Sequence, residues 1–260
     1  MQSSIVTKLL ALLTIVSETR KPLTFSELVA KSGLNKSTIH RLLTICTEER
    51  LITFDEHRKV YFVGPKIFDL VRNAYSGYDI QAVALDEMMR LHSLFDGNVT
   101  IGLPNGMEVV YLRVLESRRS MGPIQRPGMR EPVHCSASGK ALMAFLPDKM
   151  VHSKLDGYKF EKYTDRTIDN AEAFFKALQE VRELGYARND REEYEHFMGI
   201  SAPIFNYMCE PIAVINIWTV DSLHTFKELT SWSGELRASA ERVTNLIGGT
   251  APDLASLRGK

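Results

Sequence analysis

Apolar residues recur at helical spacing through the first 50 residues of the chain. An apolar stripe from Ile5 to Ser17 predicts a first helix. Thr24 and Glu27 have the spacing of a capping box, in which each side chain bonds the backbone amide of the other residue, so a short second helix is expected over Thr24 to Lys31. A third helix is expected from Lys36 to about Glu49. The pattern therefore predicts a compact unit of three helices.

The segment between the second and third helices, Ser32-Gly33-Leu34-Asn35, carries the signals of a tight turn. Gly33 suits the left-handed conformation that ends many helices, and Asn35 can cap the next helix. Two helices joined by a glycine-bearing turn, the second with small polar and basic residues near its start, are typical of a helix-turn-helix that reads the DNA major groove. Ile39, Leu42, Leu43 and Cys46 would be buried, and the outward-facing residues that would contact DNA are Lys36, Ser37, Thr38, His40, Arg41 and Thr44.

These outward-facing residues suit two kinds of DNA contact. Free amides at a helix start bind phosphate, so Lys36, Ser37 and Thr38 would anchor the DNA backbone. His40 or Arg41 would reach base edges, and Arg41 is the better candidate for base readout. The alternative is a structural three-helix unit whose third helix is merely solvated.

Two short runs rich in β-branched and aromatic residues follow the third helix. Leu51 to Phe54 and Lys59 to Val63 are expected to pair as a hairpin, which would form the wing of a winged helix-turn-helix. Arg58 and Lys59 at its tip would touch phosphates or a minor groove, although the neighbouring acidic residues weaken the positive field. A helix after Gly64-Pro65 would link this unit to a second domain, with the boundary near residue 77.

The rest of the chain mixes helical and strand periods, which predicts an α+β domain with a mainly antiparallel sheet. The domains are expected at 1–64 for the winged unit, 65–78 for the linker helix, 79–248 for the second domain and 249–260 for a frayed tail. One helix of the second domain is expected to begin after a cap at Asp79. The other expected helices span Ser136–Phe145, Asn170–Leu184 and a single long stretch from Phe226 to Ile247. The expected strands are a hairpin from Asn98 to Leu112 and two runs at Ile200–Phe205 and Ile212–Trp218.

Small residues occupy the expected helix start at Ser136-Ala137-Ser138-Gly139. An anion such as a carboxylate can approach free backbone amides there, and the hydroxyls of Ser136 or Ser138 would add donors. The alternative is a helix packed closely on the sheet with Ser136 as its cap. Phosphate-loop, serine-hydrolase and metallohydrolase patterns all fail in this chain, so neither catalytic residues nor a metal or cofactor is expected.

Composition limits the classes of protein further. The 260 residues contain 32 Lys and Arg against 32 Asp and Glu, yet residues 1–78 hold 11 basic and 7 acidic residues, which allows an anion-seeking first unit. Three scattered cysteines without a C-x-x-C pair suggest a reducing cytoplasm. The longest apolar stretch, Leu9 to Val16, is far shorter than the ~20 residues that cross a bilayer, so no membrane span is expected.

Three stretches of the chain resemble the IclR family of bacterial transcriptional regulators. They are Leu34 to Leu43 in the third helix, His134 to Leu142 in the second domain, and Gly185-Tyr186-Ala187 through Glu192 to Ile200-Ser201-Ala202-Pro203-Ile204. The resemblance implies a winged helix-turn-helix, a linker helix and a GAF-like α/β effector-binding domain, assembled as homodimers or dimers of dimers on double-stranded operator DNA. It also implies a pocket for a small organic acid or aromatic effector, lined by residues matched by position: Ala137, Ser138, Asn189, Gly199, Asn216 and Trp218.

The residues and the resemblance together predict an effector-responsive DNA-binding regulator in the cytoplasm, a repressor of a catabolic operon released or modulated by a small organic acid. This chain departs from the family pattern at Asn189, His196, Asn216 and Trp218, and Trp218 would either narrow the pocket or offer a face for stacking. The first alternative is a small-molecule enzyme that uses the helical unit for oligomerisation. A second is a structural dimerisation protein that associates through the stripe from Phe226 to Ile247.

Overall fold

The structure is a computed structural model of the chain, and it describes residues 5–19, 21–75, 79–119, 126–253 and 257. The chain divides into two compact units after Gly77, each with its own hydrophobic core. The boundary expected from the sequence, near residue 77, falls among residues 76–78, which lie outside the described residues.

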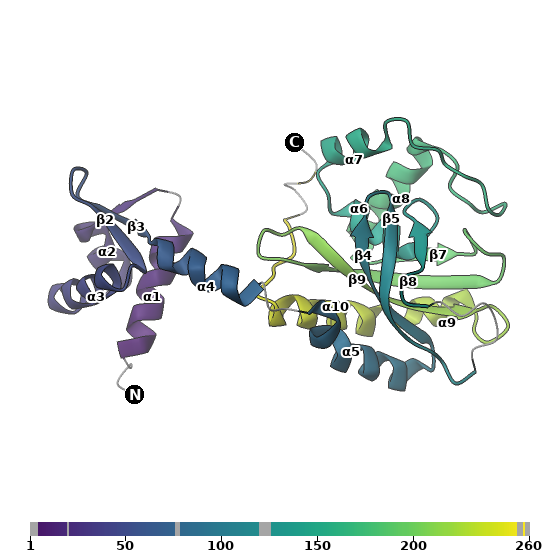
Figure 1. Ribbon diagram of the computed structural model, residues 1–260, viewed down its shortest axis with the longest axis horizontal. Helices are drawn as coiled ribbons and strands as arrows, with labels where there is room; N and C mark the ends of the chain where they lie inside the picture. The colour runs from purple at the N-terminus through teal and green to yellow at the C-terminus, as the bar shows by residue number, and fades with distance from the viewer. Residues whose placement is uncertain (1–4, 20, 76–78, 120–125, 254–256, 258–260) are drawn as a thin grey trace. The chain divides into compact units, whose positions relative to one another are not determined.

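The first unit combines short helices with a small sheet (Figure 1). Its strands form an antiparallel sheet in the order β1-β3-β2, in which β2 and β3 are the expected hairpin. Strand β1 was not predicted, because it has only two residues and so shows no alternating pattern. The elements of this unit are α1 (Ile5–Glu18), β1 (Leu23–Thr24), α2 (Phe25–Ser32), α3 (Lys36–Glu48), β2 (Ile52–Asp55), β3 (Val60–Val63) and α4 (Pro65–Tyr75).

The cap signals in the sequence are present in the structure of this unit. Thr24 and Glu27 form the capping box of α2, and Gly33 ends that helix with φ of 64°. The side chain of Asn35 accepts a hydrogen bond from the amide of Thr38 and so caps α3. These local bonds fix the turn between the two helices, and the apolar residues that they direct inward are Leu28, Ile39, Leu42, Leu43 and Cys46.

The second unit is built on a six-stranded antiparallel sheet in the order β6-β5-β4-β9-β8-β7. Its strands are β4 (Asn98–Asn105), β5 (Glu108–Leu115), β6 (Arg130–Pro132), β7 (Ala187–Asp190), β8 (Phe197–Phe205) and β9 (Pro211–Val220). Its helices are α5 (Ile80–Phe95), α6 (Ala137–Ala144), α7 (Asp148–Leu155), α8 (Ala171–Leu184), α9 (Phe226–Ser231) and α10 (Ser233–Leu246).

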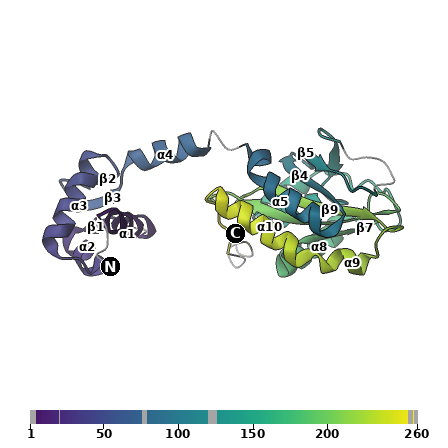
Figure 2. The same cartoon turned by 90° about the horizontal axis from the view of Figure 1, so that it is seen from below.

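The sheet of the second unit is covered on both faces. Figures 1 and 2 show α5 and α10 side by side on one face, where their apolar residues join one core with β4, β8 and β9. The other face carries α6 and α8, which form a second core with residues of β5, β7 and β9. Because α6 lies directly on the strands, its first turn is held against the sheet.

Several expectations for the second unit differ from the structure. The single long helix from Phe226 is divided at Trp232, whose amide bonds the carbonyl of Leu229, and whose ring stacks on Phe95 at a centroid distance of 4.9 Å. The tail was expected to be frayed, but Leu257 is buried in the core beside α6 and α8. Strands β6 and β7 were missed because Arg130–Pro132 and Ala187–Asp190 lack an alternating apolar pattern, and helix α7 was also missed.

In the part of the chain that the structure describes, no helix combines the length and the apolar character that a membrane span requires.

Candidate functional site

The outer face of α3 has the composition that the sequence analysis expected of a DNA-reading helix. His40 and Arg41 are exposed, whereas Ile39 and Leu42, which flank them in the sequence, are buried. Of the other residues assigned to this face, Lys36, Ser37 and Thr44 are exposed and Thr38 is half-buried. A row of polar and basic side chains therefore faces outward along the first two turns and a half of the helix.

Hydrogen bonds at the start of α3 set which groups remain available there. The carboxamide oxygen of Asn35 accepts from the amide of Thr38 at 2.8 Å and from the hydroxyl of Ser37 at 3.0 Å. The amides of Lys36 and Ser37 have no intrahelical partner, as in the first turn of any α-helix. This helix start can therefore still donate hydrogen bonds to a phosphate.

Two side chains further along α3 are oriented by their neighbours. The ring of His40 lies edge-on to the ring of Phe25 at a centroid distance of 6.4 Å. The hydroxyl of Thr44 donates to the carbonyl of His40 at 3.0 Å. Thr44 thus bonds its own helix, whereas Arg41 forms no ion pair with any residue that the structure describes.

The wing presents two basic side chains at its tip. Arg58 and Lys59 are both exposed, and Lys59 occupies the left-handed region with φ of 54°. The Asp55 carboxylate accepts hydrogen bonds from the amides of His57 and Arg58, so it serves the turn. The ammonium of Lys59 lies 5.8 Å from the ring centroid of Phe54.

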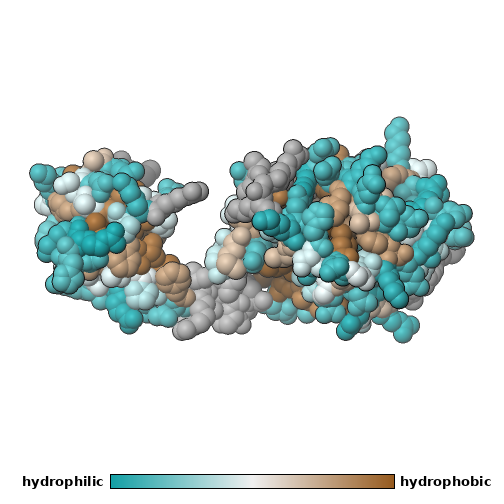
Figure 3. All heavy atoms as spheres, turned by 90° about the horizontal axis from the view of Figure 1, so that it is seen from above, coloured by the Kyte–Doolittle hydropathy of each residue, from teal (hydrophilic) through white to brown (hydrophobic). Residues whose placement is uncertain are grey.

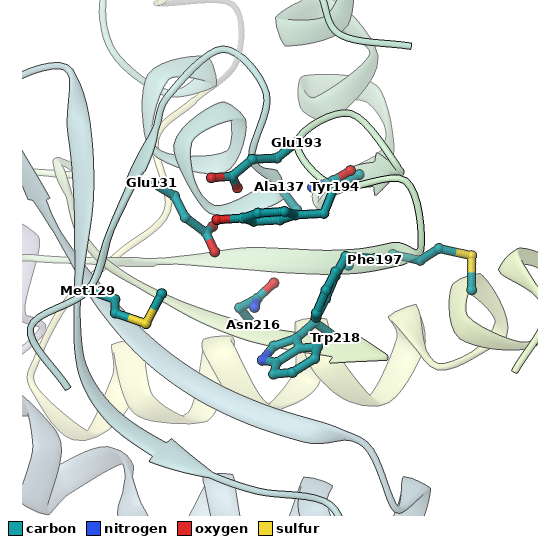
Figure 4. A pocket seen from close by; sticks show the side chains of 11 residues that line it. Met129, Glu131, Ala137, Glu193, Tyr194, Phe197, Asn216 and Trp218 are labelled. Carbon is teal, nitrogen blue, oxygen red and sulfur yellow. The ribbon is translucent and has the colours of Figure 1, made fainter. Parts of the chain in front are cut away.

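A hollow in the second unit brings together residues from both sheet strands and loops (Figure 4). It is a small cavity of about 40 Å³ within a recess of about 510 Å³ that opens to solvent. Five of the seven residues assigned to the effector pocket line it, namely Ala137, Asn189, Gly199, Asn216 and Trp218. The rest of its lining was not expected from the sequence and consists of Met129, Glu131, Glu193, Tyr194, Phe197 and Met198.

Ser136 and Ser138 do not line the hollow, which corrects the expectation that their hydroxyls would meet a ligand. The Ser136 hydroxyl donates to the carbonyl of Pro132 at 2.8 Å and accepts from the amide of Gly139 at 3.0 Å. The hydroxyl oxygens of Ser138 and Tyr111 lie 2.9 Å apart, within hydrogen-bond distance. Both side chains are fully buried, so the polar groups of this helix start are used inside the protein.

Close packing explains why the start of α6 has small residues. A Cβ atom on Gly139 would lie only 2.2 Å from the Cα atom of Val133. Most of this segment therefore matches the alternative interpretation, in which the helix packs tightly on the sheet and Ser136 is its cap. Ala137 alone among the four residues Ser136 to Gly139 reaches the hollow.

Two carboxylates are the most distinctive chemical groups of the hollow. The carboxylate of Glu131 accepts a hydrogen bond from the Tyr111 hydroxyl at 2.5 Å. Glu193 is 8% exposed, and burial together with the charge of Glu131 raises its pKa to about 9. A pKa this high means that Glu193 holds its proton at neutral pH. No local pattern in the sequence distinguishes these glutamates from surface ones.

Trp218 forms the opposite part of the lining with Phe197, whose ring centroid lies 5.0 Å from its own. Trp218 is 4% exposed, and its indole Nε1 has no hydrogen-bond partner among the described residues. A buried polar atom without a partner costs free energy, about 1 to 3 kcal/mol in typical cases, and calls for an explanation. An acceptor on a ligand would satisfy this donor.

The asparagines of the hollow are held by neighbouring groups. Asn216 donates to the hydroxyl of Thr100 at 3.1 Å, and Asn189 accepts from the amide of Glu192 at 2.9 Å. The Glu192 carboxylate meets the ammonium of Lys140 at 2.5 Å, with the Lys140 side chain 4% exposed. The Lys140–Glu192 pair ties the loop that carries Glu193 to helix α6.

The described residues include no group of three or more His, Cys, Asp or Glu side chains arranged to hold a metal ion. His134, the histidine nearest to α6 in sequence, uses both ring nitrogens, at 2.7 Å from the Tyr158 hydroxyl and 2.9 Å from the Glu161 carbonyl. Cys135 is buried, and burial raises the pKa of its thiol. A thiol in this state is a poor nucleophile.

A winged helix-turn-helix followed by a separate domain with a partly enclosed pocket is the architecture of a DNA-binding transcriptional regulator. Two family models match the chain in this order. The IclR helix-turn-helix domain matches residues 5–56, and the C-terminal domain of the bacterial transcriptional regulator IclR matches residues 72–245. The chain therefore belongs to the IclR family of bacterial transcriptional regulators, which are not enzymes.

Comparisons with individual proteins agree with this family. The HTH-type transcriptional regulator XynR of Escherichia coli is 26% identical over 243 residues, covering 94% of this chain and 96% of that protein. A solved structure of a putative IclR regulator from a Silicibacter species aligns with 96% of this chain and 98% of its own, at a TM-score of 0.81 and 23% identity. An IclR homolog from Microbacterium hydrocarbonoxydans, complexed with 4-hydroxybenzoate, aligns with 94% of this chain and 99% of its own, at a TM-score of 0.57 and 20% identity.

Proposed function

We propose that this IclR-family regulator is a cytoplasmic repressor of a catabolic operon, and that a small organic acid or aromatic effector releases or modulates it. The exposed polar and basic face of α3 is the observation that carries the proposal, because the same helix buries Ile39, Leu42, Leu43 and Cys46 on its other side. Repression requires only that the bound protein occupy DNA that the polymerase needs, so it is the simplest mode for such a chain.

The DNA contacts of this proposal follow from the geometry of α3 and the wing. The free amides and side chains of Lys36, Ser37 and Thr38 bind phosphate, and Arg41 reads a base edge with His40 beside it. Thr44 lies one turn further along the same face. Arg58 and Lys59 at the tip of the wing add phosphate contacts.

The test of DNA binding is gel retardation with the DNA upstream of the regulator's own operon. We expect a shift that selects this DNA over a scrambled duplex of equal length, and that weakens steeply with salt. Equal retardation of the two duplexes at every salt concentration would contradict a sequence-specific regulator. A reporter gene under the same promoter then gives the sign of regulation.

The hollow beside α6 is the proposed effector site. Ala137, Asn189, Gly199, Asn216 and Trp218 line it, and the related homolog complexed with 4-hydroxybenzoate supports a small aromatic effector. A Cβ atom on Gly199 would make contacts no closer than 3.5 Å, so Gly199→Val should be tolerated while its methyl groups fill the hollow. We expect this variant to lose its response to effector in the reporter assay and to keep its affinity for the operator.

A homodimer, or a dimer of dimers, completes the proposal. Figure 3 shows apolar atoms at the surface of the first unit, and Phe68 and Leu70 on α4 are 68% and 52% exposed. A second copy would cover such residues. The linker proposed over residues 65–78 contains α4, and its last three residues lie outside the described residues. A two-fold dimer requires a pseudo-palindromic operator, because each α3 reads one half-site. Light scattering on the purified chain measures the oligomer directly.

A further inference from the structure

A second and larger recess lies elsewhere in the second unit. Its cavity volume is about 710 Å³, against about 40 Å³ for the hollow, and the two share no described lining residue. Sites for small organic ligands typically enclose about 300 to 1,000 Å³. Strand β8 contributes its first residues to the hollow and its last residues to the recess, so the two cavities are separate.

The recess exists because strand β8 is longer than its neighbour β7. The pairing of the two strands ends at Ser201, so the rest of β8 has no described strand beside it on that side. Pro203 lies within this free edge and has no amide hydrogen to offer to an added strand. The edge therefore suits a small molecule better than a partner's β-strand. Small residues of α10 and of the segment after it leave room there, namely Gly234, Ala238, Ala240, Gly249 and Ala251.

Arg182 on α8 is the buried charged residue of the recess, with its side chain 4% exposed. Its Nε atom donates to the carbonyl of Ala144, and its Nη2 atom donates to the carbonyl of Leu146 and the carboxylate of Asp148. Nε and Nη2 share one edge of the planar guanidinium, and Nη1 lies on the other edge. None of the three acceptors lines the recess, so the edge that carries Nη1 is the one left for it.

The Nη1 atom of Arg182 is an unused donor. No described residue accepts a hydrogen bond from it. It is also reached by solvent, because Trp218 Nε1 is the one fully enclosed side-chain nitrogen or oxygen without a partner in the described chain. A guanidinium that is largely buried and still has free N–H groups is incompletely satisfied. An acceptor bound in the recess would complete its hydrogen bonds.

A second guanidinium and an apolar wall lie in the same recess. Arg237 on α10 is exposed and forms no hydrogen bond or ion pair with the described residues. A Cβ atom on Gly185 would lie 3.2 Å from its Nε atom, so the Arg237 side chain rests against the end of α8, whose last turn carries Arg182. Phe145 and Phe205 are each 6% exposed and pack edge to face, with ring centroids 5.2 Å apart. The recess therefore combines donors from two guanidinium groups with aromatic surface.

One acidic side chain opposes an anion in the recess. Glu241 lies one turn after Arg237 on α10 and forms no ion pair with it. Asp148 already neutralises Arg182, so the selectivity of the recess depends on directed N–H donors and not on a net positive charge. Water and salt screen the exposed Glu241, whereas the hydrogen bonds of Arg182 hold its Nη1 in place. These donors favour a carboxylate, which can accept from a guanidinium through two oxygens.

We propose that this recess is a second ligand site, which binds a small carboxylate with an apolar body. The carboxylate accepts from Nη1 of Arg182 and from the guanidinium of Arg237, and the apolar body packs on Phe145 and Phe205. The inference goes beyond the proposed function, because the recess is separate from the effector hollow and its occupation does not depend on DNA. Helix α10 forms one wall of the recess and packs on α5, so a bound ligand stabilises this pair of helices.

Three probes of matched shape test the ligand class: 4-phenylbutyrate, 4-phenylbutanol and 4-phenylbutylamine. Their binding is measured by calorimetry on the full chain carrying Gly199→Val, which fills the hollow and so removes it as a competing site. A cooperative melting transition shows that this protein is folded. We expect the butyrate to bind at least about tenfold tighter than the alcohol, because only the carboxylate accepts charge-assisted hydrogen bonds. The amine should bind no tighter than the alcohol.

Exposed residues of the second unit provide variants that assign the binding to the recess. In the same background, Arg237→Gln should weaken butyrate binding at least about fivefold and leave alcohol binding unchanged. Glu241→Gln should strengthen butyrate binding by about twofold to tenfold, since an opposing charge is removed. Ala238→Phe places a ring in the recess and should abolish binding of all three probes. Lys227→Gln removes an equal charge from α9, outside the recess, and should change none of the affinities.

Three results would overturn this inference: equal affinities for the butyrate and the alcohol, no binding of any probe, or butyrate binding that Arg237→Gln leaves unchanged. Equal weakening by Lys227→Gln and Arg237→Gln would also contradict it, because the effect would then come from overall charge. Gel retardation on the same preparations reports on the regulator function separately. Sequence-selective retardation without butyrate binding removes only the second site, whereas butyrate binding without such retardation removes only the proposed function.

Discussion

Single residues on α3 either hold the helix in place or face outward, and few do both. Asn35 and Ile39 position the helix through a cap and through burial, whereas the Arg41 side chain is exposed and forms no hydrogen bond or ion pair with the described residues. Replacing Arg41 therefore tests recognition with little effect on folding.

Arg41→Ala should weaken operator binding by about 1 to 3 kcal/mol and affect a scrambled duplex less, because a base contact is lost. The matched control is Lys59→Ala, which removes a proposed phosphate contact from the wing. It should weaken both duplexes alike and reduce the slope of log affinity against log salt by about 1. Fluorescence anisotropy over a salt series measures both quantities. Unchanged operator affinity in both variants would show that the assigned face is wrong.

Glu193 makes the stability of the fold depend on pH. Its pKa is raised to about 9 from an ordinary value of 4.5, so the folded chain holds the proton more tightly than the unfolded chain. The stability gained from this proton is complete below the unfolded pKa and is lost as pH rises through the folded pKa. Glu193→Gln keeps a neutral side chain at every pH. Its melting temperature should exceed that of the wild type by a margin that grows between about pH 6 and pH 9.

Differential scanning fluorimetry of the two proteins measures this margin. Glu195→Gln, at an exposed position, should show no trend with pH. A margin for Glu193→Gln that stays constant over the range would mean that the carboxylate is not buried beside Glu131.

At the scale of elements, the sequence predicts those helix starts and ends that are set by hydrogen bonds between neighbouring residues. The capping box at Thr24, the cap at Asn35 and the left-handed Gly33 all act within four residues, so their signals can be read directly along the chain. The acidic lining of the pocket could not be predicted in this way. Glu131 and Glu193 are 62 residues apart and meet only because β6 and the loop after β7 lie over the start of α6.

The close packing of α6 on the segment before it gives a prediction at this scale. Gly139→Ala places a Cβ atom 2.2 Å from the Cα atom of Val133, which is backbone and cannot move aside cheaply. We expect a loss of about 1 to 3 kcal/mol in the free energy of unfolding, measured by urea titration.

Gly234→Ala in α10 is the control, because its new Cβ meets no atom within 4 Å. It should be neutral or stabilise by up to about 1 kcal/mol, since alanine favours a helix over glycine. Equal losses in the two variants would contradict the packing described for α6.

At the scale of the whole molecule, the proposed function requires that a ligand in the second unit change how the first unit binds DNA. Such coupling is a free energy shared by the two ligands, so it must be reciprocal. If saturating effector lowers operator affinity by some factor, operator DNA must lower effector affinity by the same factor, typically about 5-fold to 150-fold. Anisotropy with labelled operator and calorimetry with the effector measure the two factors on one preparation. We expect them to agree in the wild type, and both to fall to one in Gly199→Val, whose hollow is filled. A factor that stays above one in Gly199→Val would mean that the effector acts at a site other than this pocket. Factors that differ in the wild type would mean that one of the ligands also changes the oligomer, because a closed cycle with one ligand at each site cannot produce unequal couplings.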